Sequence, residues 1–575
     1  MKRLALIAIW ALGACGDGGG ASDVADTLAP DSVDDADASD VADATDADTT
    51  DADATDATDA DTTPSPAWYE RAVMYEIFGR SFQDSDGDGI GDLPGLISRL
   101  DYLNDGVPGS GDDLEVDGLW LMPIFAASSY HGYDTTDYTT VDPHYGTNAD
   151  LEALAAACEA RGMHLVLDFV MNHTGDQHPW FADAESSASS AHRNWYVWRG
   201  DDPGWTQPFG SHDRVWHSGG GAFYYGIFTA AMPDLNYREP AVVAAMTDVA
   251  RGWLDKGVTG FRLDAARYLV EGTSANALAE QPETHAFWKD LRAALAPGRP
   301  DLYLVGEAWT SRDAVTTYYG GGAELHQAFD FDLEGALEMT LTRGAASWLA
   351  STLAQQKQAG APWSFEATFM SNHDLDRPTS RLPAGSLPAA ATLLLTMPGT
   401  PYIYYGDELG ALYAPGLGDK SKRGPMAWSA DAKAGFTTGT PWLALANESA
   451  TRNVASEMAD PSSLLQHHRR LIALRHAHPA LAGDGVKVLT APDPGLFAML
   501  RWSADEVVVV IVNVANASPA AVTLDLSSEA ELLGDGPWTI ASLLDDADSV
   551  IASDRAAIPT GGAWTPYESR ILRLR

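Results

Sequence analysis

Cysteine is almost absent from this chain, which contains only Cys15 and Cys158 among 575 residues. Because one of the two lies in the first fifteen residues, the body of the protein has no second cysteine to pair with, which excludes a disulfide framework. Cys158 falls in the helical pattern "LEALAAACEARG", and we predict that it is a small buried apolar residue.

Basic residues are also scarce, with 36 Lys and Arg against 81 Asp and Glu, and the formal net charge is −45. Nucleic acids and anionic membranes are bound by basic surface, so this balance argues against both as partners. Residues 16–66 contain 16 Asp and no Lys or Arg, and "DATDADTT" occurs there at 43–50 and again at 56–63. Since this Asp/Ala/Thr tract has no apolar face to bury, we expect residues 16–66 to be a disordered acidic tether.

Apolar runs long enough to span a membrane are missing too. The chain starts with positive charge in "MKR", an apolar core in "LALIAIWAL" and small residues before Cys15, which together indicate an export signal. "LGAC" also resembles the bacterial lipoprotein box, whose cysteine becomes the acylated first residue. We therefore predict a lipoprotein-type signal peptide over residues 1–15, lipidation of Cys15, and an exported protein whose only attachment to the cell-envelope membrane is this lipid. The alternative is an ordinary signal peptide followed by a chance cysteine.

Short apolar runs alternate with helical patterns after residue 66, which is typical of a parallel sheet. Eight such runs predict an α/β fold, a (β/α)8 TIM barrel over residues 67–480. Residues 174–236 follow the third run, are rich in aromatic residues and Gly, and predict an inserted domain. Residues 485–575 predict a C-terminal antiparallel β-sandwich domain. The eight predicted strands are 73–79, 118–123, 164–169, 260–264, 302–307, 328–331, 367–373 and 402–406.

Acidic residues stand where four of these strands end: Asp168, Asp264, Glu307 and Asp374. The carboxyl ends of barrel strands meet at one mouth, so we expect these carboxylates to converge. In "GFRLDAAR", Arg262 precedes Asp264 by two residues, which places both side chains on the same face of a strand. Each acid taken alone could cap a helix or pair with an arginine, but four at one mouth indicate chemistry.

Two carboxyls that flank a glycosidic bond make a glycosidase. A metal-dependent hydrolase on the same fold is the rival interpretation, and it would need several histidines at the strand ends. His173 and His373 are instead isolated, and each follows an Asn. This pattern favours recognition of sugar hydroxyls over a transition metal.

These segments resemble the alpha-amylase family of glycoside hydrolases, family 13. "DFVMNH" (168–173), "GFRLDAAR" (260–267), "GEAW" (306–309) and "FMSNHD" (369–374) are similar to its four main conserved regions and occur in the same order. "HGYDTTDY" (131–138), "MPDLN" (232–236) and "RGPMAW" (423–428) resemble further segments of the family. The resemblance runs from about residue 68 to the C-terminus and is specific as an ordered set. It implies that 174–236 is the domain B of the family and that the tail is its domain C.

The resemblance also implies roles for individual residues. Asp264 would be the nucleophile, Glu307 the general acid and base, and Asp374 the third acid, which holds sugar hydroxyls. Neighbouring negative charge would keep Glu307 protonated near neutral pH. The other residues implied to bind substrate are Arg262, which would orient Asp264 and keep it ionised, Tyr133, which would stack under the sugar, and His173 and His373, which would bind its hydroxyls.

"DSDGDGIGD" (84–92) alternates acids with glycine in the manner of a calcium loop. It is no EF-hand, because its twelfth position is Gly95, and a solvated acidic turn is the alternative. Some members of the family have a calcium loop after the first strand. That likeness implies a structural calcium held by Asp84, Asp86, Asp88 and Asp92 and by the carbonyl of Ile90.

"MPDLN" is similar to the segment of an intermediate group that contains exported bacterial alpha-amylases. The function implied is cleavage of α-1,4-glucosidic bonds in starch, maltodextrins or maltooligosaccharides, with retention. The alternatives are an α-glucosidase, a neopullulanase or cyclomaltodextrinase, or a transglycosylase of the same family. A surface glucan-binding protein with little turnover is the alternative from another class. Family members that lost catalysis lack the three acids, which are all present in this chain.

Overall fold

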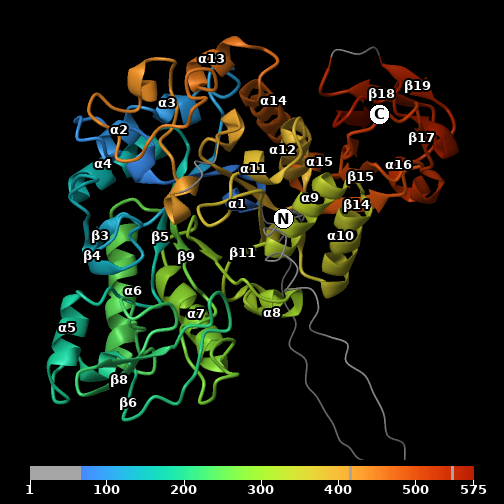
Figure 1. The fold of residues 1–575 in the computed structure, drawn as a ribbon. Helices are drawn as coiled ribbons and strands as arrows, with labels where there is room; N and C mark the ends of the chain where they lie inside the picture. The colour runs from blue at the N-terminus through green and yellow to red at the C-terminus, as the bar shows by residue number, and fades with distance from the viewer. Residues whose placement is uncertain (1–66, 413–416, 546–548) are drawn as a thin grey trace, which may run out of the picture. The chain divides into compact units, whose positions relative to one another are not determined.

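The computed structural model describes residues 67–412, 417–545 and 549–575 (Figure 1). The predicted signal peptide, Cys15 and the acidic tether lie outside the described residues. No helix in the described part of the chain is long and apolar enough to cross a membrane.

Eight parallel strands form a closed barrel, which confirms the predicted fold. The strands pair in the order β1-β13-β12-β11-β10-β9-β5-β2, so the first strand of the barrel lies between the second and the last. Every predicted strand overlaps one of the observed strands, which are β1 (Met74–Ile77), β2 (Gly118–Leu121), β5 (His164–Phe169), β9 (Gly260–Leu263), β10 (Tyr303–Gly306), β11 (Gln327–Phe329), β12 (Glu366–Phe369) and β13 (Thr400–Tyr404).

Alternate residues of these strands separate two apolar layers. Inside the barrel, Met74, Trp120, Val166 and Phe369 belong to one cluster, and the Tyr303 and Tyr402 hydroxyls lie 2.8 Å apart. The residues between them, such as Leu119 and Leu263, pack outward with the helices. The barrel interior is therefore a filled core and not an open pore.

Helices surround the barrel, as Figure 1 shows. Helix α4 begins with a capping box between Thr147 and Asp150 and buries Cys158, as predicted. The helices in this part of the chain are α1 (Trp68–Arg71), α2 (Leu93–Ile97), α3 (Leu100–Leu103), α4 (Asn148–Glu159), α6 (Pro240–Leu254), α7 (Pro282–Leu295), α8 (Arg312–Thr317), α9 (Phe331–Arg343), α10 (Ser347–Ala359), α11 (Pro378–Arg381), α12 (Leu387–Thr396), α13 (Val454–Ala459), α14 (Leu464–Ala477) and α15 (Pro479–Ala482).

Two small sheets interrupt the alternation of strands and helices. Strands β3 (Phe125–Ala127) and β4 (Thr135–Val141) pair after β2. Between β5 and β9, the chain forms α5 (Pro179–Ser186) and an antiparallel sheet in the order β6-β8-β7. Its strands are β6 (Trp198–Arg199), β7 (Trp216–Gly219) and β8 (Ala222–Tyr225). All of these last elements fall within 174–236, the range predicted for the inserted domain.

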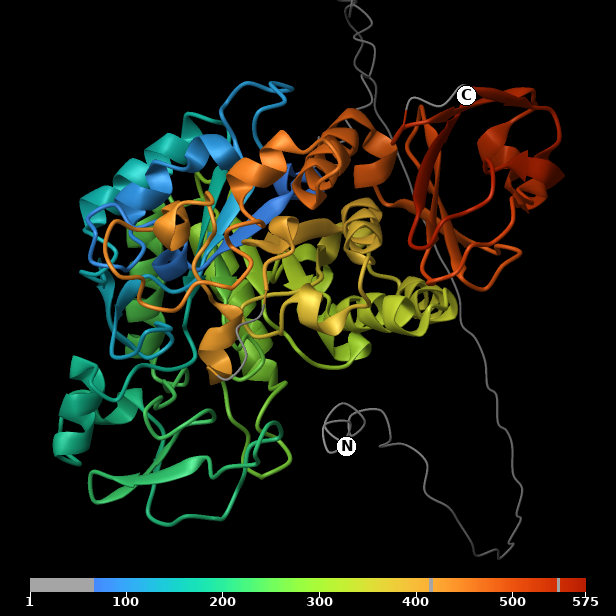
Figure 2. The ribbon, with the colours of Figure 1, turned by 45° about the horizontal axis from the view of Figure 1, so that its top comes forward.

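The C-terminal part of the chain forms a six-stranded antiparallel sheet in the order β14-β15-β16-β21-β18-β19, shown in red in Figures 1 and 2. Strands β17 and β20 form a separate pair. Arg501 of this sheet is fully buried and donates to backbone carbonyls, including that of Thr396 at the end of α12. The elements are β14 (Gly485–Leu489), β15 (Leu496–Trp502), β16 (Val507–Asn513), β17 (Thr523–Leu524), α16 (Ala530–Leu533), β18 (Trp538–Ser542), β19 (Val550–Ala552), β20 (Ile558–Pro559) and β21 (Ser569–Leu574).

Candidate active site

One buried arginine joins three carboxylates at the mouth of the barrel. Arg262, on β9, is 2% exposed. Its Nη1 donates to Asp264 Oδ1 at 2.6 Å and to Asp168 Oδ1 at 3.0 Å. Its Nη2 lies 2.9 Å from Glu307 Oε2. The bond to Asp264 places both side chains on one face of β9, as their spacing predicts.

Glu307 follows β10 and is held from two sides. Besides Arg262, the backbone N–H of Ala265 donates to Glu307 Oε2 at 3.1 Å. Burial raises the pKa of Glu307, Arg262 opposes this, and the negative charges of Asp264 and Asp374 add to it. The raised pKa agrees in direction with the sequence-based prediction. Its main cause differs, because burial contributes more than the neighbouring charge on which the prediction was based.

Asp374 lies at the end of a line of polar groups that starts inside the barrel. Its Oδ2 is 3.2 Å from His373 Nε2, and its Oδ1 is 3.3 Å from Arg423 Nη2. Burial would favour the neutral acid, but His373 and Arg423 outweigh it and hold the pKa of Asp374 well below its usual range. The Asp374 side chain keeps 45% of its surface exposed, so an ionised carboxylate faces the mouth.

Tyr133 and His373 stack with ring centroids 5.6 Å apart. The Tyr133 hydroxyl lies 2.6 Å from His373 Nε2 and donates to Asp168 Oδ2 at 3.0 Å. His373 Nδ1 is 2.7 Å from Glu76 Oε1, and both side chains are almost fully buried. The structure thus brings Tyr133, His373 and Asp374 into one connected group with Arg262.

His173 contacts the site through the backbone of Tyr133. Its Nε2 lies 3.1 Å from the Tyr133 carbonyl oxygen, so this nitrogen carries the proton and donates. Burial lowers the pKa of His173 to about 4 and keeps the ring neutral. Its Nδ1 lies 3.3 Å from Asn172 Nδ2. The predicted contact of His173 with a sugar hydroxyl stays a prediction.

Two residues that contact this group were not identified from the sequence. Glu76 is a single acid in the apolar run "VMYEIFG", and its position two residues after Met74 was the available signal for an inward side chain. Arg423 lies in an irregular segment without a periodic pattern, and the available signal was its place at the start of "RGPMAW", a segment that resembles the family. Its Nε donates to the His373 carbonyl at 3.2 Å.

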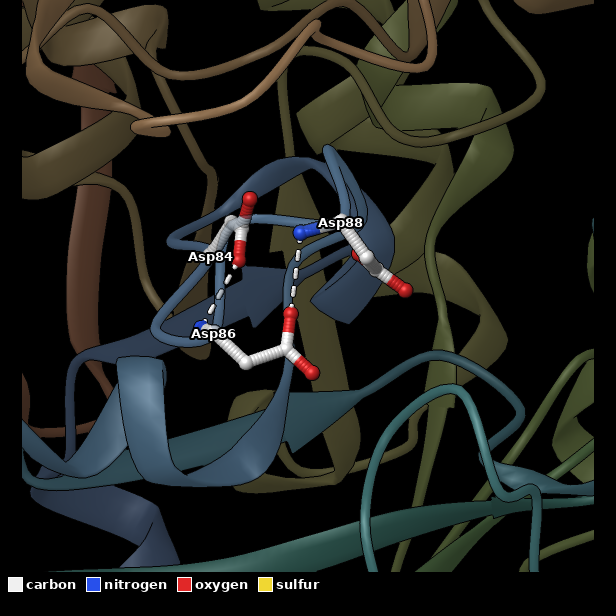
Figure 3. A group of neighbouring side chains, drawn as sticks. All are labelled: Asp84, Asp86 and Asp88. Atoms are coloured by element: carbon white, nitrogen blue, oxygen red, sulfur yellow. Dashed lines mark hydrogen bonds between the residues drawn. The ribbon is translucent and has the colours of Figure 1, made fainter.

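The acidic loop after β1 brings three predicted ligands together. Single carboxylate oxygens of Asp84, Asp86 and Asp88 lie within 4.8 Å of one another (Figure 3). Asp84 is buried, and the other two are exposed. Asp92 is instead the N-cap of α2, accepting from Gly95 N at 2.6 Å, and it also accepts from Ser85 N at 2.9 Å. Ile90 follows the group, and its own N–H donates to Asp88 Oδ1 at 2.7 Å.

This loop packs against a segment far along the chain. Asp84 N donates to the Phe436 carbonyl at 3.0 Å, and Trp442 N donates to the Gly89 carbonyl at 2.9 Å. Gly89 has φ +94, and a Cβ there would lie 1.8 Å from the Thr440 carbonyl oxygen. Only glycine fits this close approach of two backbones.

Comparisons with known proteins agree with this geometry. The family model described as "Alpha amylase, catalytic domain" matches residues 76–484. Alpha-amylase 3 of Dictyoglomus thermophilum is 34% identical over 454 residues, which are 78% of this chain and 85% of that protein. An oligo-1,6-glucosidase of Halalkalibacterium halodurans is 29% identical over an alignment that covers 88% of this chain and 99% of that protein. The crystal structure of the alpha-amylase from H.orenii superposes with a TM-score of 0.77 at 33% identity, over 88% of this chain and 99% of that one. The chain belongs to the alpha-amylase family and is a glycosidase.

Proposed function

We propose that this glycosidase hydrolyses α-1,4-glucosidic bonds in starch, maltodextrins or maltooligosaccharides with retention of the anomeric configuration. The observation that carries this proposal is the binding of Asp264 and Glu307 to one guanidinium, that of Arg262. Retaining glycosidases hold their two carboxyls about 5–5.5 Å apart, too close for a water between them. Two carboxylates bound to the same guanidinium lie close together, which agrees with the short carboxyl–carboxyl distance of retaining enzymes better than with the longer distance of inverting enzymes.

The chemistry has two steps. In the first step, an Asp264 oxygen forms a bond to the anomeric carbon as the glycosidic bond breaks, and Glu307 gives its proton to the departing oxygen. In the second step, Glu307 takes a proton from water, the water oxygen bonds to the anomeric carbon, and Asp264 leaves. The raised pKa of Glu307 supports the first half of this cycle, because the acid form is the one that donates.

The third acid and the aromatic ring would hold the sugar. Asp374 is ionised, partly exposed and next to a histidine N–H, an arrangement suited to binding two neighbouring sugar hydroxyls. Tyr133 is half-buried over Arg262, whose guanidinium carbon lies 5.9 Å from the ring centroid. Its stacked position supports a role as the platform beneath the reacting ring.

Relatives named alpha-amylase and the "MPDLN" segment support α-1,4 bonds. The relative named oligo-1,6-glucosidase favours a second candidate, an α-glucosidase or transglycosylase of the same family. The test is a product time course on soluble starch, maltoheptaose, pullulan and isomaltose, with the anomeric form of new ends read by NMR. We expect α-maltooligosaccharides from starch and no attack on isomaltose. Glucose from isomaltose, panose from pullulan or longer transfer products would instead support the second candidate.

We also propose a structural calcium at the acidic loop. The metal-ligand atoms that Asp84, Asp86 and Asp88 offer are all oxygens, which suit this hard cation. Within this group, no positive charge offsets the repulsion among the three carboxylates. When bound, calcium would supply the positive charge that these carboxylates lack. The loop itself would be fixed against residues 436–442, which it already contacts through Asp84 and Gly89.

We further propose export and attachment to the bacterial cell envelope through a lipid on Cys15, at the periplasmic or cell surface. The support is the sequence alone: the charged start, the apolar core and "LGAC". The acidic residues 16–66 would then separate the folded part from the membrane.

A further inference from the structure

Glu76 is a buried carboxylate that the proposed two-step chemistry does not use. It lies on β1, two residues after Met74 of the barrel interior, and is 1% exposed. Its register neighbours are Trp120 on β2 and Tyr404 on β13. A charge at such a depth is costly unless it is paired, so its partner is informative.

That partner is His373. Glu76 Oε1 lies 2.7 Å from His373 Nδ1 and also accepts from the His373 backbone N–H at 3.3 Å. The carboxylate therefore fixes both the ring and the backbone of the residue that precedes Asp374. The rings of Trp120 and His373 pack nearly perpendicular to each other, with centroids 5.5 Å apart.

The directions of the hydrogen bonds define the protonation of the ring. The Tyr133 hydroxyl donates to Asp168, so its oxygen is left to accept from His373 Nε2. Glu76 can only accept when ionised, so Nδ1 must donate. Both ring nitrogens then carry hydrogen, and His373 is an imidazolium in which every polar atom is a donor.

We propose that Glu76 is a positioning residue that keeps His373 doubly protonated, so that its Nε2–H stays a donor toward the Tyr133 hydroxyl and Asp374, the two groups proposed to hold the sugar. This inference rests on the proposed function for the identity of the substrate. Without the negative charge of Glu76, the ring loses one of its two hydrogens as pH rises, and a neutral ring cannot donate from Nδ1 and Nε2 at the same time.

The charges around the pair agree with this assignment. Burial opposes the imidazolium, but Asp374 and Glu76 outweigh it and raise the pKa of His373 to about 10. Burial raises the pKa of Glu76, while His373 and Arg262 oppose the increase. The other titratable or charged groups that face the pair are Tyr133, Asp168, Asp374, Tyr402, Tyr404 and Arg423.

The first test measures affinity, because titration of Glu307 would otherwise dominate a rate profile. Binding of maltoheptaose to full-length E307Q and E307Q/E76Q is measured by calorimetry from pH 5.5 to 9. We expect similar affinities at pH 5.5 and at least a tenfold weaker affinity of E307Q/E76Q at pH 9. E76D in the same background keeps the charge and should remain close to E307Q. A ratio that is constant across pH would indicate a merely structural role and overturn the proposal.

A matched control is available in the turn that follows β13. Glu408 is also fully buried, and its Oε1 accepts from the hydroxyls of Tyr75 and Tyr102 and not from His373. E307Q/E408Q should therefore follow E307Q at every pH. If it reproduces the pH-dependent loss, the effect belongs to any buried glutamate and the proposal fails.

A second test needs no substrate and no Glu76 variant. In wild-type protein labelled with ¹³C at histidine Cε1, the NMR signal that is absent from H373Q should keep its imidazolium shift from pH 6 to 8.5. A signal that titrates near pH 6.5, the ordinary histidine value, overturns the proposal. Because this readout is independent of sugar, failure of the proposed function shows separately, as an absence of turnover by the wild type.

Discussion

Ala265 donates its backbone N–H to Glu307 while its own backbone is in the left-handed region, at φ 51. This conformation is uncommon for a residue other than glycine, and it directly follows Asp264. The turn directs the N–H of the peptide after Asp264 toward Glu307. The two carboxylates are therefore held by this short piece of backbone as well as by Arg262. The backbone conformation of "LDAA" (263–266) therefore helps to fix the position of Asp264 relative to Glu307.

Replacing Asp264 tests the nucleophile. D264N should lower kcat on maltoheptaose by on the order of 10⁴-fold, because the amide cannot form the glycosyl ester. The melting temperature should change little, since Arg262 keeps Asp168 and Glu307 as partners. D290N, at an exposed position of α7, is the matched control and should retain full activity. Activity that survives D264N would contradict the assignment.

The raised pKa of Glu307 sets the alkaline limb of activity. The first step needs the protonated acid, so kcat/KM on maltoheptaose should fall as pH rises through a pKa above the ordinary glutamate value of about 4.3. α-Maltosyl fluoride needs no proton on its leaving group. E307Q should therefore turn over the fluoride far better than the oligosaccharide, and equal losses on both would contradict the role.

Removal of calcium should destabilise the fold. At free calcium 100 times the dissociation constant, binding to the native state alone adds about 2.7 kcal/mol to the free energy of unfolding. A chelator should then lower the melting temperature of the wild type. D86N alters an exposed member of the group and should melt at the same temperature with and without chelator. A wild-type melting temperature that is the same with and without the chelator would argue against the calcium site.

His326 should contribute to acid sensitivity. Its Nδ1 accepts the Leu304 N–H at 3.0 Å, and burial lowers its pKa to about 3. The folded pKa is below the unfolded value of about 6.5, so the stabilisation is present above pH 6.5 and is lost as pH falls toward 3. In urea unfolding, the advantage of wild type over H326N should shrink by at most about 1.4 kcal/mol for each pH unit below 6.5. A wild-type advantage that stays constant as pH falls would contradict this role of His326.

Lipidation at Cys15 can be tested by detergent partitioning. Wild-type protein expressed in a bacterium with lipoprotein processing should enter the detergent phase, and C15S should remain in the aqueous phase with its activity intact. C158S is the control for loss of a thiol, because Cys158 is buried in α4. Equal partitioning of wild type and C15S would refute the anchor.

The barrel could be predicted from the sequence because its strands are short apolar runs that alternate with helical patterns, and four of the runs end at an acidic residue. The placement of Asp264, Glu307 and Asp374 at one mouth followed from the same rule, since parallel strands end on the same side. The ion pair of Arg262 with Asp264 is local in sequence and needed only the alternation of a strand.

Contacts between distant residues could not be predicted in this way. Glu76 and His373 are 297 positions apart, and only closure of the barrel brings them together. The direction in which His173 points depends on the backbone of Tyr133, which carries no side-chain signal. Asp92 resembles a ligand by its spacing, yet the start of α2 takes its carboxylate.

The close approach of Gly89 to Thr440 also bears on the order of folding. During synthesis, β1 and the acidic loop emerge first, but their neighbours on β13 and in residues 436–442 emerge more than three hundred residues later. Until then, an edge of β1 and three carboxylates stay without these contacts. Such distant contacts fold slowly. Closure of the barrel and completion of the acidic loop therefore both depend on segments that are made near the end of the catalytic region.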